Sequence, residues 1–128
     1  MKVLLDTHSF LWLITGDERL SETAKQTFLN PDTQLFFSAA SFWEICIKAS
    51  LGKIALQSGW SETIQNEMLD NSIQWLPIEI PHCIEVAKLP FHHRDPFDRL
   101  LIAQAMVEDM HLLSRDSRFL AYAVPRIW

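Results

Sequence analysis

Short apolar runs alternate with longer segments of helical periodicity along this chain. Five apolar runs have the length and composition of strands, and they span 2–5, 34–37, 73–78, 111–114 and, more weakly, 124–128. Between them, apolar residues recur every three or four positions, which predicts helices at 7–14, from Ser21 onward, at 40–51, 58–70, 82–88 and 96–110. Ser21 is a suitable helix cap, and Gly52 is placed to end the third of these helices.

This alternation predicts an α/β fold, with a mostly parallel sheet of four or five strands and helices on both faces. A chain of 128 residues is large enough for one core, so residues 1–128 are interpreted as a single domain. In such sheets, ligands bind beyond the carboxyl ends of the strands. Polar residues that directly follow a strand are therefore the first candidates for a functional site.

Four acidic residues stand at the junctions between predicted elements: Asp6, Glu44, Asp98 and Asp116. Asp6 and Asp116 both lie just past a predicted strand, at the edge where ligands bind. If the fold gathers all four carboxylates, their mutual repulsion raises several pKa values unless cations neutralise them. Hard divalent ions such as Mg²⁺ or Mn²⁺ suit such a site, and their commonest work in enzymes is on phosphate esters.

Each acid also has a purely structural interpretation. Asp6 is placed to cap the helix that follows it, and Asp116 is placed to cap a short helix at 117–121 or to form an Asx turn. Glu44 precedes Lys48 by four residues, the favourable order for a helical ion pair. Asp98 stands in the first turn of a helix, where a negative charge favours the helix dipole.

Neighbouring polar residues are weighed in the same way. Asp95 and Pro96 fit the cap and first position of the helix so well that Asp95 is left out of the metal set. The adjacent pair His92 and His93 lies in a loop, and such neighbours rarely share one ion. Four arginines flank the acids and are candidates for phosphate contacts or for salt bridges: Arg94, Arg99, Arg115 and Arg118.

Composition narrows the class of protein. The net charge of −5 argues against extensive groove binding to nucleic acid, but an enzyme that grips a short stretch with bound metal ions remains compatible with it. Cys46 and Cys83 lack metal-binding spacing. Asp6 interrupts the first apolar run, so we expect no signal peptide, and no apolar run has the length of a membrane span. These features predict a cytoplasmic protein.

Of the five tryptophans, Trp12 and Trp43 are candidates for a partner-facing surface.

Four segments together resemble the PIN-domain ribonucleases, and in particular the VapC-type toxins of bacterial type II toxin–antitoxin pairs. The segments are Leu4-Leu5-Asp6-Thr7-His8, Ser38-Ala39-Ala40-Ser41-Phe42-Trp43-Glu44-Ile45, His93-Arg94-Asp95-Pro96-Phe97-Asp98-Arg99-Leu100-Leu101-Ile102-Ala103-Gln104-Ala105 and Leu113-Ser114-Arg115-Asp116. The closing residues 124–128 also resemble one subgroup of the family. The resemblance runs through the whole chain in order, and the third segment is its most specific part.

The resemblance implies a PIN-like fold and an Mg²⁺ or Mn²⁺ site made by the four acids, with Thr7 and Ser114 in support. It implies hydrolysis of RNA by a metal-activated water, which leaves a 5′-phosphate and a 3′-hydroxyl. It also implies a small antitoxin that covers the acidic cleft, a homodimer, and a larger assembly of toxin with antitoxin.

Two other functions are compatible with the residues. Another metal-dependent phosphoesterase would use the same acids, although the chain has no DxD nucleophile motif and no glycine-rich phosphate loop. A non-catalytic binding module with this fold is the second, and the complete set of acids argues against it. The RNA target, the cleavage sequence and the number of metal ions are left open.

Overall fold

The structure, a computed structural model, describes residues 1–128 and has one sheet of five strands in which every neighbouring pair runs parallel. The strands are β1 Lys2–Leu5, β2 Gln34–Ser38, β3 Ile73–Leu76, β4 His111–Leu113 and β5 Arg126–Ile127, in the spatial order β3-β2-β1-β4-β5. The predicted parallel α/β sheet is confirmed, and its weakest predicted strand is present as β5.

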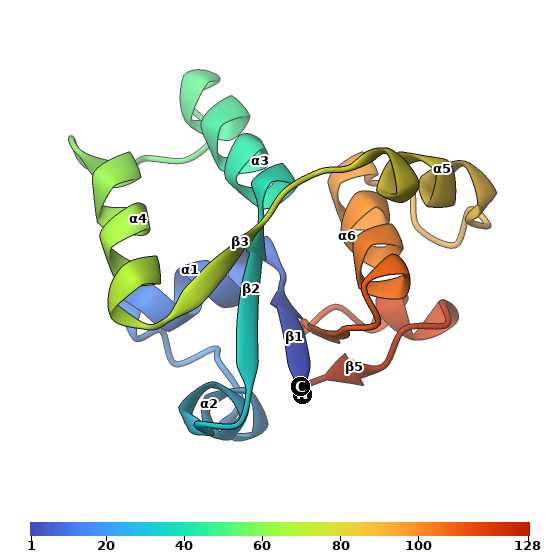
Figure 1. Ribbon diagram of the computed structural model, residues 1–128. Coiled ribbons are helices and arrows are strands. Elements are labelled where there is room, and N and C mark those ends of the chain that lie inside the picture. Colours follow the sequence, from blue (N-terminus) through green and yellow to red (C-terminus); the bar gives the residue numbers. More distant parts are fainter.

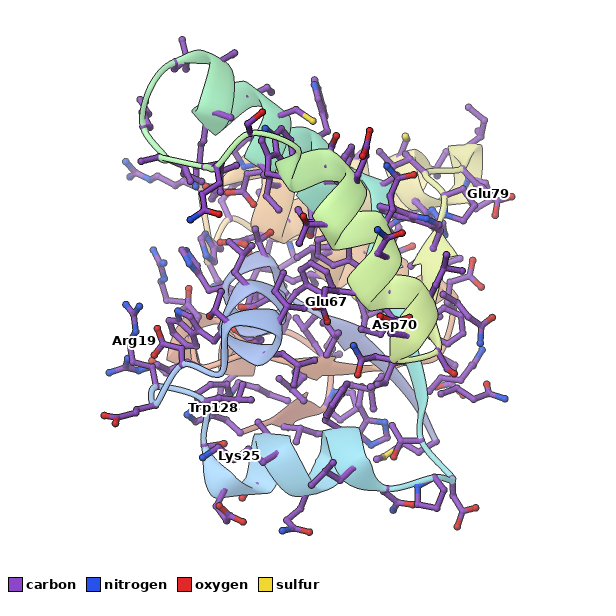
Figure 2. The ribbon with its side chains drawn as sticks, turned by 90° about the vertical axis from the view of Figure 1, so that its left-hand side faces the viewer. Arg19, Lys25, Glu67, Asp70, Glu79 and Trp128 are labelled. Atoms are coloured by element: carbon purple, nitrogen blue, oxygen red, sulfur yellow. The ribbon has the colours of Figure 1, made fainter.

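Seven helices connect the strands: α1 Thr7–Thr15, α2 Glu22–Leu29, α3 Ala39–Ser50, α4 Trp60–Asp70, α5 Ile80–Lys88, α6 Pro96–Val107 and the 3₁₀ helix η1 Ser117–Ala121. The helices α1, α2 and α4 lie on one side of the sheet and α6 lies on the other, as Figure 1 shows. Figure 2 looks onto the first of these sides. None of the helices is both long and apolar enough to cross a membrane.

The central strand β1 is buried on both faces, and its side chains divide between two cores. Val3 and Leu5 belong to a cluster with Phe10 and Phe37, whereas Leu4 belongs to a cluster with Leu112 and the inner face of α6. This division follows from the two-residue period of a strand. It explains why the N-terminal run is continuously apolar rather than alternating.

Several predicted boundaries were wrong by two or three residues. The helix expected at 96–110 ends at Val107, because Asp109 adopts a left-handed backbone (φ 54°) that turns the chain into β4. The strand expected at 73–78 ends at Leu76, because Pro77 has no N–H to donate to a neighbour. The helix expected at 82–88 begins at Ile80, since Pro81 is tolerated in a first turn.

The order of the strands makes the carboxyl end of β1 a switch point. From β1 the chain goes to β2 and β3, which extend the sheet toward one edge. It then returns to β4 and β5, which extend the sheet toward the opposite edge. The crevice between diverging connections is where α/β sheets bind ligands. Asp6 stands at this point, and its backbone N–H donates to the carbonyl of Leu113 on β4 at 3.1 Å.

A buried polar network attaches α6 to the end of β2. The Ser38 hydroxyl donates to Gln104 Oε1 at 2.6 Å and accepts from the N–H of Ala40, which caps α3. Gln104 Nε2 donates in turn to the Pro77 carbonyl at 3.2 Å. Because both Ser38 and Gln104 are fully buried, this network has no competing water and fixes the start of α3 relative to α6.

We expect Gln104→Ala to lower the free energy of unfolding by about 2–4 kcal/mol, since it leaves a cavity and removes the hydrogen bonds of Gln104 with the buried Ser38 hydroxyl and the Pro77 carbonyl. Urea denaturation measures this loss. The matched control is Gln65→Ala, because Gln65 is exposed and bonds only to the Ser61 carbonyl of its own helix. Similar losses in both variants would contradict the role of the network.

Candidate active site

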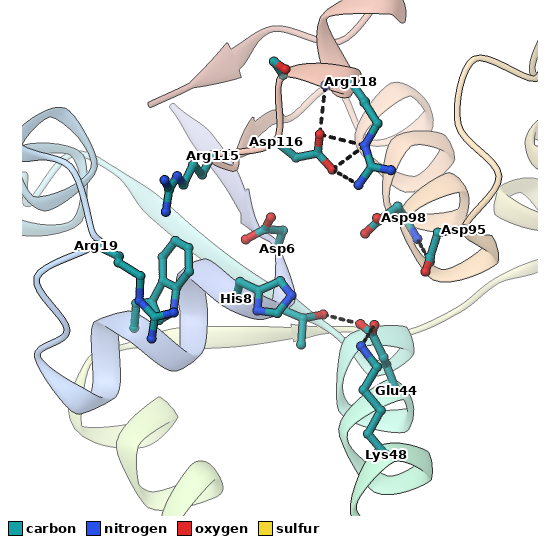
Figure 3. Close-up of a pocket in the computed structure, with 13 residues that line it drawn as sticks. Asp6, His8, Arg19, Glu44, Lys48, Asp95, Asp98, Arg115, Asp116 and Arg118 are labelled. Atoms are coloured by element: carbon teal, nitrogen blue, oxygen red, sulfur yellow. Dashed lines mark hydrogen bonds and ion pairs between the residues drawn. The ribbon is translucent and has the colours of Figure 1, made fainter. Parts of the chain in front are cut away.

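A cleft of about 570 Å³ opens at the carboxyl edge of the sheet, and 12 of its 13 lining residues are polar or charged. All four acids singled out in the sequence line this cleft, together with Asp95. Figure 3 shows that they come from separate elements: Asp6 from the end of β1, Glu44 from α3, Asp98 from the start of α6 and Asp116 from the segment after β4. The topology thus brings together carboxylates that are far apart in the chain.

Asp6 both caps α1 and faces the cleft. Its Oδ1 accepts from the Ser9 N–H at 2.8 Å, and its Oδ2 accepts from the Ser114 hydroxyl at 2.6 Å. Burial raises the pKa of Asp6, and the hydrogen bonds from Ser114 and Ser9 oppose that rise. The capping role and the cleft position were considered as alternatives, and the structure contains both.

Glu44 is buried, and both of its carboxylate oxygens have partners. Thr7 Oγ1 donates to Oε1 at 2.7 Å, and Lys48 Nζ lies 2.8 Å from Oε2. The ion pair with Lys48 is therefore present as the sequence spacing predicts. Thr7 follows Asp6 directly, so this hydrogen bond fixes Glu44 relative to the end of β1.

Asp98 is affected both by burial and by the charges of four other carboxylates. Asp95 caps α6 by accepting from the Asp98 N–H at 3.0 Å, as predicted, and this brings a second carboxylate close. Burial, followed by the charges of Asp95, Asp6, Glu44 and Asp116, raises the pKa of Asp98 to about 7. At neutral pH this carboxyl is only partly ionised unless a cation is present.

Asp116 has the opposite environment. It caps η1 by accepting from the Arg118 N–H at 2.9 Å, and the Arg118 guanidinium reaches both of its oxygens at 2.7 to 3.0 Å. These contacts with Arg118 lower the pKa of Asp116 to about 2. Asp116 and Asp98 are thus neighbouring carboxylates with widely separated pKa values.

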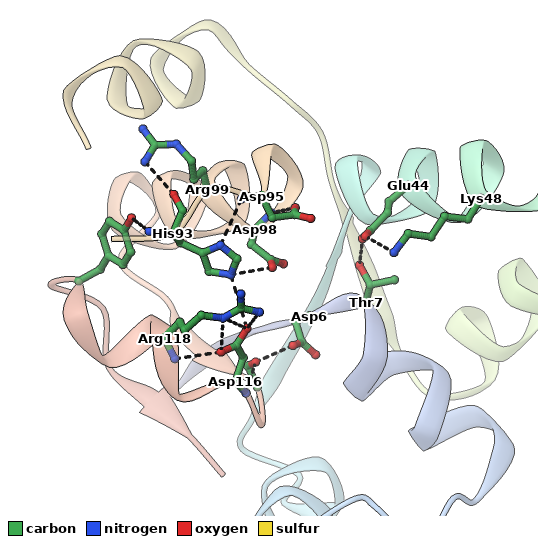
Figure 4. A network of polar contacts seen from close by, with 12 residues as sticks. Asp6, Thr7, Glu44, Lys48, His93, Asp95, Asp98, Arg99, Asp116 and Arg118 are labelled. Atoms are coloured by element: carbon green, nitrogen blue, oxygen red, sulfur yellow. Dashed lines mark hydrogen bonds and ion pairs between the residues drawn. The ribbon is translucent and has the colours of Figure 1, made fainter. Parts of the chain in front are cut away.

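His93 is a site residue that the sequence interpretation missed. Its buried ring lies between Asp98 and Asp116, with Nε2 at 3.0 Å and 3.5 Å from their Oδ2 atoms (Figure 4). Nδ1 accepts from the Asp95 N–H at 3.2 Å, so in the neutral ring the proton is on Nε2. Nε2 makes no hydrogen bond, although it lies with carboxylate oxygens of Asp98 and Asp116 in a group whose ligand atoms are within 4.8 Å of one another. With the proton on Nε2, His93 is not a metal ligand in this orientation.

The burial of His93 depends on partners that no local pattern reveals. Its backbone N–H donates to the Tyr122 hydroxyl at 2.8 Å, and its ring stacks on Phe119 with 5.7 Å between centroids. Both partners come from the region after β4. The only signal in the sequence is that His93 lies two residues before a helix cap.

The four candidate arginines are placed differently. Arg115 and Arg118 line the cleft, whereas Arg94 is exposed outside it. Arg99 is buried, and its guanidinium donates to the backbone carbonyls of Val86, Leu89, Pro90 and His93. The expected phosphate contact was wrong for Arg99, because these carbonyls occupy its donors and it instead holds the loop before α6.

The oxygen atoms that line the cleft are suitable ligands for a hard divalent cation. Carboxylate oxygens from Asp6, Glu44, Asp98 and Asp116 are the ligands that Mg²⁺ and Mn²⁺ prefer, and hydroxyl groups of Thr7 and Ser114 steady two of them. The raised pKa of Asp98 is what a carboxylate cluster shows when no cation balances its charge.

We expect Asp98→Asn to stabilise the metal-free protein at about pH 8, by about 2 kcal/mol in the free energy of unfolding. The folded-state pKa of Asp98, about 7, exceeds its ordinary value of 3.8, so the folded protein holds this proton more tightly. The protonated Asp98 therefore contributes stability that is fully present below the ordinary pKa of 3.8 and is lost as the pH rises through the folded-state pKa of about 7.

Denaturation in EDTA at about pH 4 and about pH 8 measures this effect. The advantage of Asp98→Asn appears at the higher pH and shrinks at the lower one. Asp70→Asn serves as the control, since Asp70 is exposed and lies outside the cleft. A constant difference at both values, or an equal gain in the control, would refute the assignment of strain to Asp98.

Comparisons with known proteins agree with this geometry. The model of the PIN domain family matches residues 3–125. No protein with a curated description matches the sequence significantly.

Similar solved structures include VapBC2 from Rickettsia felis bound to promoter DNA, at 12% identity and a TM-score of 0.74, covering 98% of this chain and 97% of that chain. DNA-bound VapBC from Salmonella typhimurium has 14% identity and a TM-score of 0.72, covering 98% and 96%. VapBC-1 from nontypeable Haemophilus influenzae has 18% identity and a TM-score of 0.65, covering 98% and 96%. At such identities these likenesses show the fold. With the family match over nearly its whole length, the chain belongs to the PIN domain family.

Proposed function

We propose that this protein is a metal-dependent endoribonuclease and acts as the VapC-type toxin of a type II toxin–antitoxin pair. The observation that carries the proposal is the convergence of four carboxylates at the switch point of a PIN fold. The structural likeness to VapBC complexes supports the toxin part of the proposal. RNA is the substrate that the sequence resemblance implies.

In this proposal Asp6, Glu44, Asp98 and Asp116 hold Mg²⁺ or Mn²⁺ in the cleft. A bound ion of this kind supplies charge for the scissile phosphate and makes a coordinated water more acidic. Ser114 and Thr7 keep the carboxylates of Asp6 and Glu44 in fixed orientations through their hydrogen bonds. Fixed ligands matter because small displacements of a reacting group are costly in rate.

The basic residues beside the acids have separate roles. Arg118 is engaged with Asp116 and keeps that carboxylate ionised, so its ligand atoms stay available at acidic pH. His93 lies beside both Asp98 and Asp116, and its charge favours the ionised form of Asp116. Arg115 is the arginine most available to an incoming phosphate.

A protein partner is part of the proposal. The likeness to toxin–antitoxin complexes supports a cognate antitoxin that covers the cleft, and we place the pair in the cytoplasm. An apolar pocket of about 310 Å³ between α3, α5 and α6 supports a partner or a homodimer contact, since Trp43 and Phe97 line it and Trp43 is 57% exposed. A homodimer within a larger complex with the antitoxin is compatible with this surface.

We expect Asp6→Asn and Asp98→Asn each to reduce RNA cleavage in Mg²⁺ by at least about a hundredfold, because each removes a charged ligand. Gel analysis of a structured RNA measures the loss, and Asp70→Asn is the matched control. A small phosphate ester is assayed in parallel, since hydrolysis of the ester without cleavage of RNA would favour a general phosphoesterase. Full cleavage of the RNA by both variants would refute the proposal.

Metal binding is tested separately from cleavage. We expect calorimetric titration with Mn²⁺ to give binding that Asp98→Asn weakens by at least about tenfold, and thermal unfolding of the wild type to shift upward with Mn²⁺. EDTA reverses both effects. The absence of any heat or shift with Mn²⁺ and Mg²⁺ would favour a binding module without catalysis.

A further inference from the structure

The cleft has a second wall whose chemistry differs from that of the carboxylates. It consists of His8, Trp12, Arg19 and Arg115, which we call the aromatic wall. In Figure 3 Arg19 and Arg115 lie on the side of the cleft away from Asp95 and Asp98. The proposed metal site does not use these four residues as ligands, so their presence in the same cleft requires another explanation.

The aromatic wall is built around the indole of Trp12. His8 lies one helical turn earlier on α1, and the two rings are 5.9 Å apart with a tilt of 34°. The Arg19 guanidinium lies 4.9 Å from the centre of the indole, and the Arg115 guanidinium lies 6.0 Å from it. Trp128 supports the indole from another side at 5.9 Å. This packing fixes Trp12, whereas His8 is exposed to the cleft.

The positive charges in the cleft are not equally free. Arg19 pairs with Asp17, Lys48 with Glu44 and Arg118 with Asp116, each at 2.7 to 2.8 Å. The Arg115 guanidinium has no hydrogen bond and no ion pair, although it stands between Ser114 and Asp116 in the chain. An unpaired, exposed cation beside the carboxylate cluster is suited to an anionic ligand.

We propose that the aromatic wall binds one nucleotide of single-stranded RNA next to the scissile phosphate. Its base stacks on the exposed ring of His8, which Trp12 supports, and Arg115 contacts a phosphate of the same strand. The inference rests on the proposed function, because the nuclease site gives the strand its position. Aromatic rings and guanidinium planes are the surfaces on which unpaired bases stack.

This arrangement favours a single strand over a duplex, since a base within a helix is already stacked on its neighbours and cannot present its face. It also favours a nucleotide over a peptide, because the free cation and the aromatic rings adjoin the carboxylates that would hold the metal and the phosphate. Stacking has little base preference, so we expect this subsite to tolerate any of the four bases.

The test measures binding without cleavage. Fluorescence anisotropy follows a short single-stranded oligoribonucleotide, and a second oligonucleotide of equal length whose nucleotides lack bases, on protein that carries Asp98→Asn. We expect the abasic strand to bind about tenfold more weakly. His8→Ala removes most of this difference, and Trp12→Phe, which keeps an aromatic ring, retains it.

Arg115→Gln has a different expected result. It weakens the binding of both oligonucleotides by a similar factor. It also makes the slope of log affinity against log salt concentration shallower by about 0.7, as the loss of one contact to a single-strand phosphate requires. The matched control is Lys53→Gln, which changes an exposed cation outside the cleft and leaves both affinities unchanged.

Equal binding of intact and abasic strands would overturn the proposal. So would an intact base dependence in His8→Ala, which would assign the aromatic wall to a protein partner. The outcome is independent of catalysis: wild-type protein that cleaves no RNA but binds strands in a base-dependent way through His8 would retain the subsite and refute the nuclease. RNA cleavage by the wild type, with binding that depends neither on His8 nor on the bases, would retain the nuclease and refute the subsite.

Discussion

Burial of carboxylates at the carboxyl end of β1, together with their mutual repulsion, is the constraint on which the site depends. Three of the four acids have a donor of their own: Ser114 for Asp6, Lys48 for Glu44 and Arg118 for Asp116. Asp98 has no such donor, because the His93 Nε2 lies 3.0 Å from its Oδ2 without forming a hydrogen bond, and burial and the neighbouring carboxylates raise its pKa to about 7. The carboxylates stay close together despite their repulsion, because two apolar cores fix the elements that carry them. The site is thus arranged to gain stability when a cation binds.

Structural and functional roles are combined in these residues. Asp6 caps α1 and Asp116 caps η1, while Asp95 caps α6 and so positions Asp98. This combination follows from the topology. In a parallel sheet the helices begin at the carboxyl edge, where N-terminal dipoles and caps favour negative charge and where ligands also bind. For this reason, a capping explanation of an acid at such an edge does not count against a role in the site.

The elements and the four acids were predictable from the sequence because both depend on local pattern. Strand and helix periodicities identified all five strands, and Asp6, Asp98 and Asp116 were singled out by their places at element boundaries, whereas Glu44 depended mostly on the family resemblance. What escaped prediction depends on contacts between distant segments. His93 is buried by Tyr122 and Phe119, and Arg99 is turned inward by four carbonyls of one loop. Neither environment has a signature in the residues next to them.

The net charge of −5 also takes on a different meaning in the structure. A protein that holds nucleic acid through many phosphate contacts needs a broad basic surface, and this chain has none of the required excess. Its cleft instead has one unpaired guanidinium, that of Arg115, beside an acidic cluster and an aromatic wall. Under the proposed function, such a site suits a short, unpaired stretch of strand, because each further phosphate would meet uncompensated acidic charge. The same acidity would attract a basic segment of the proposed protein partner.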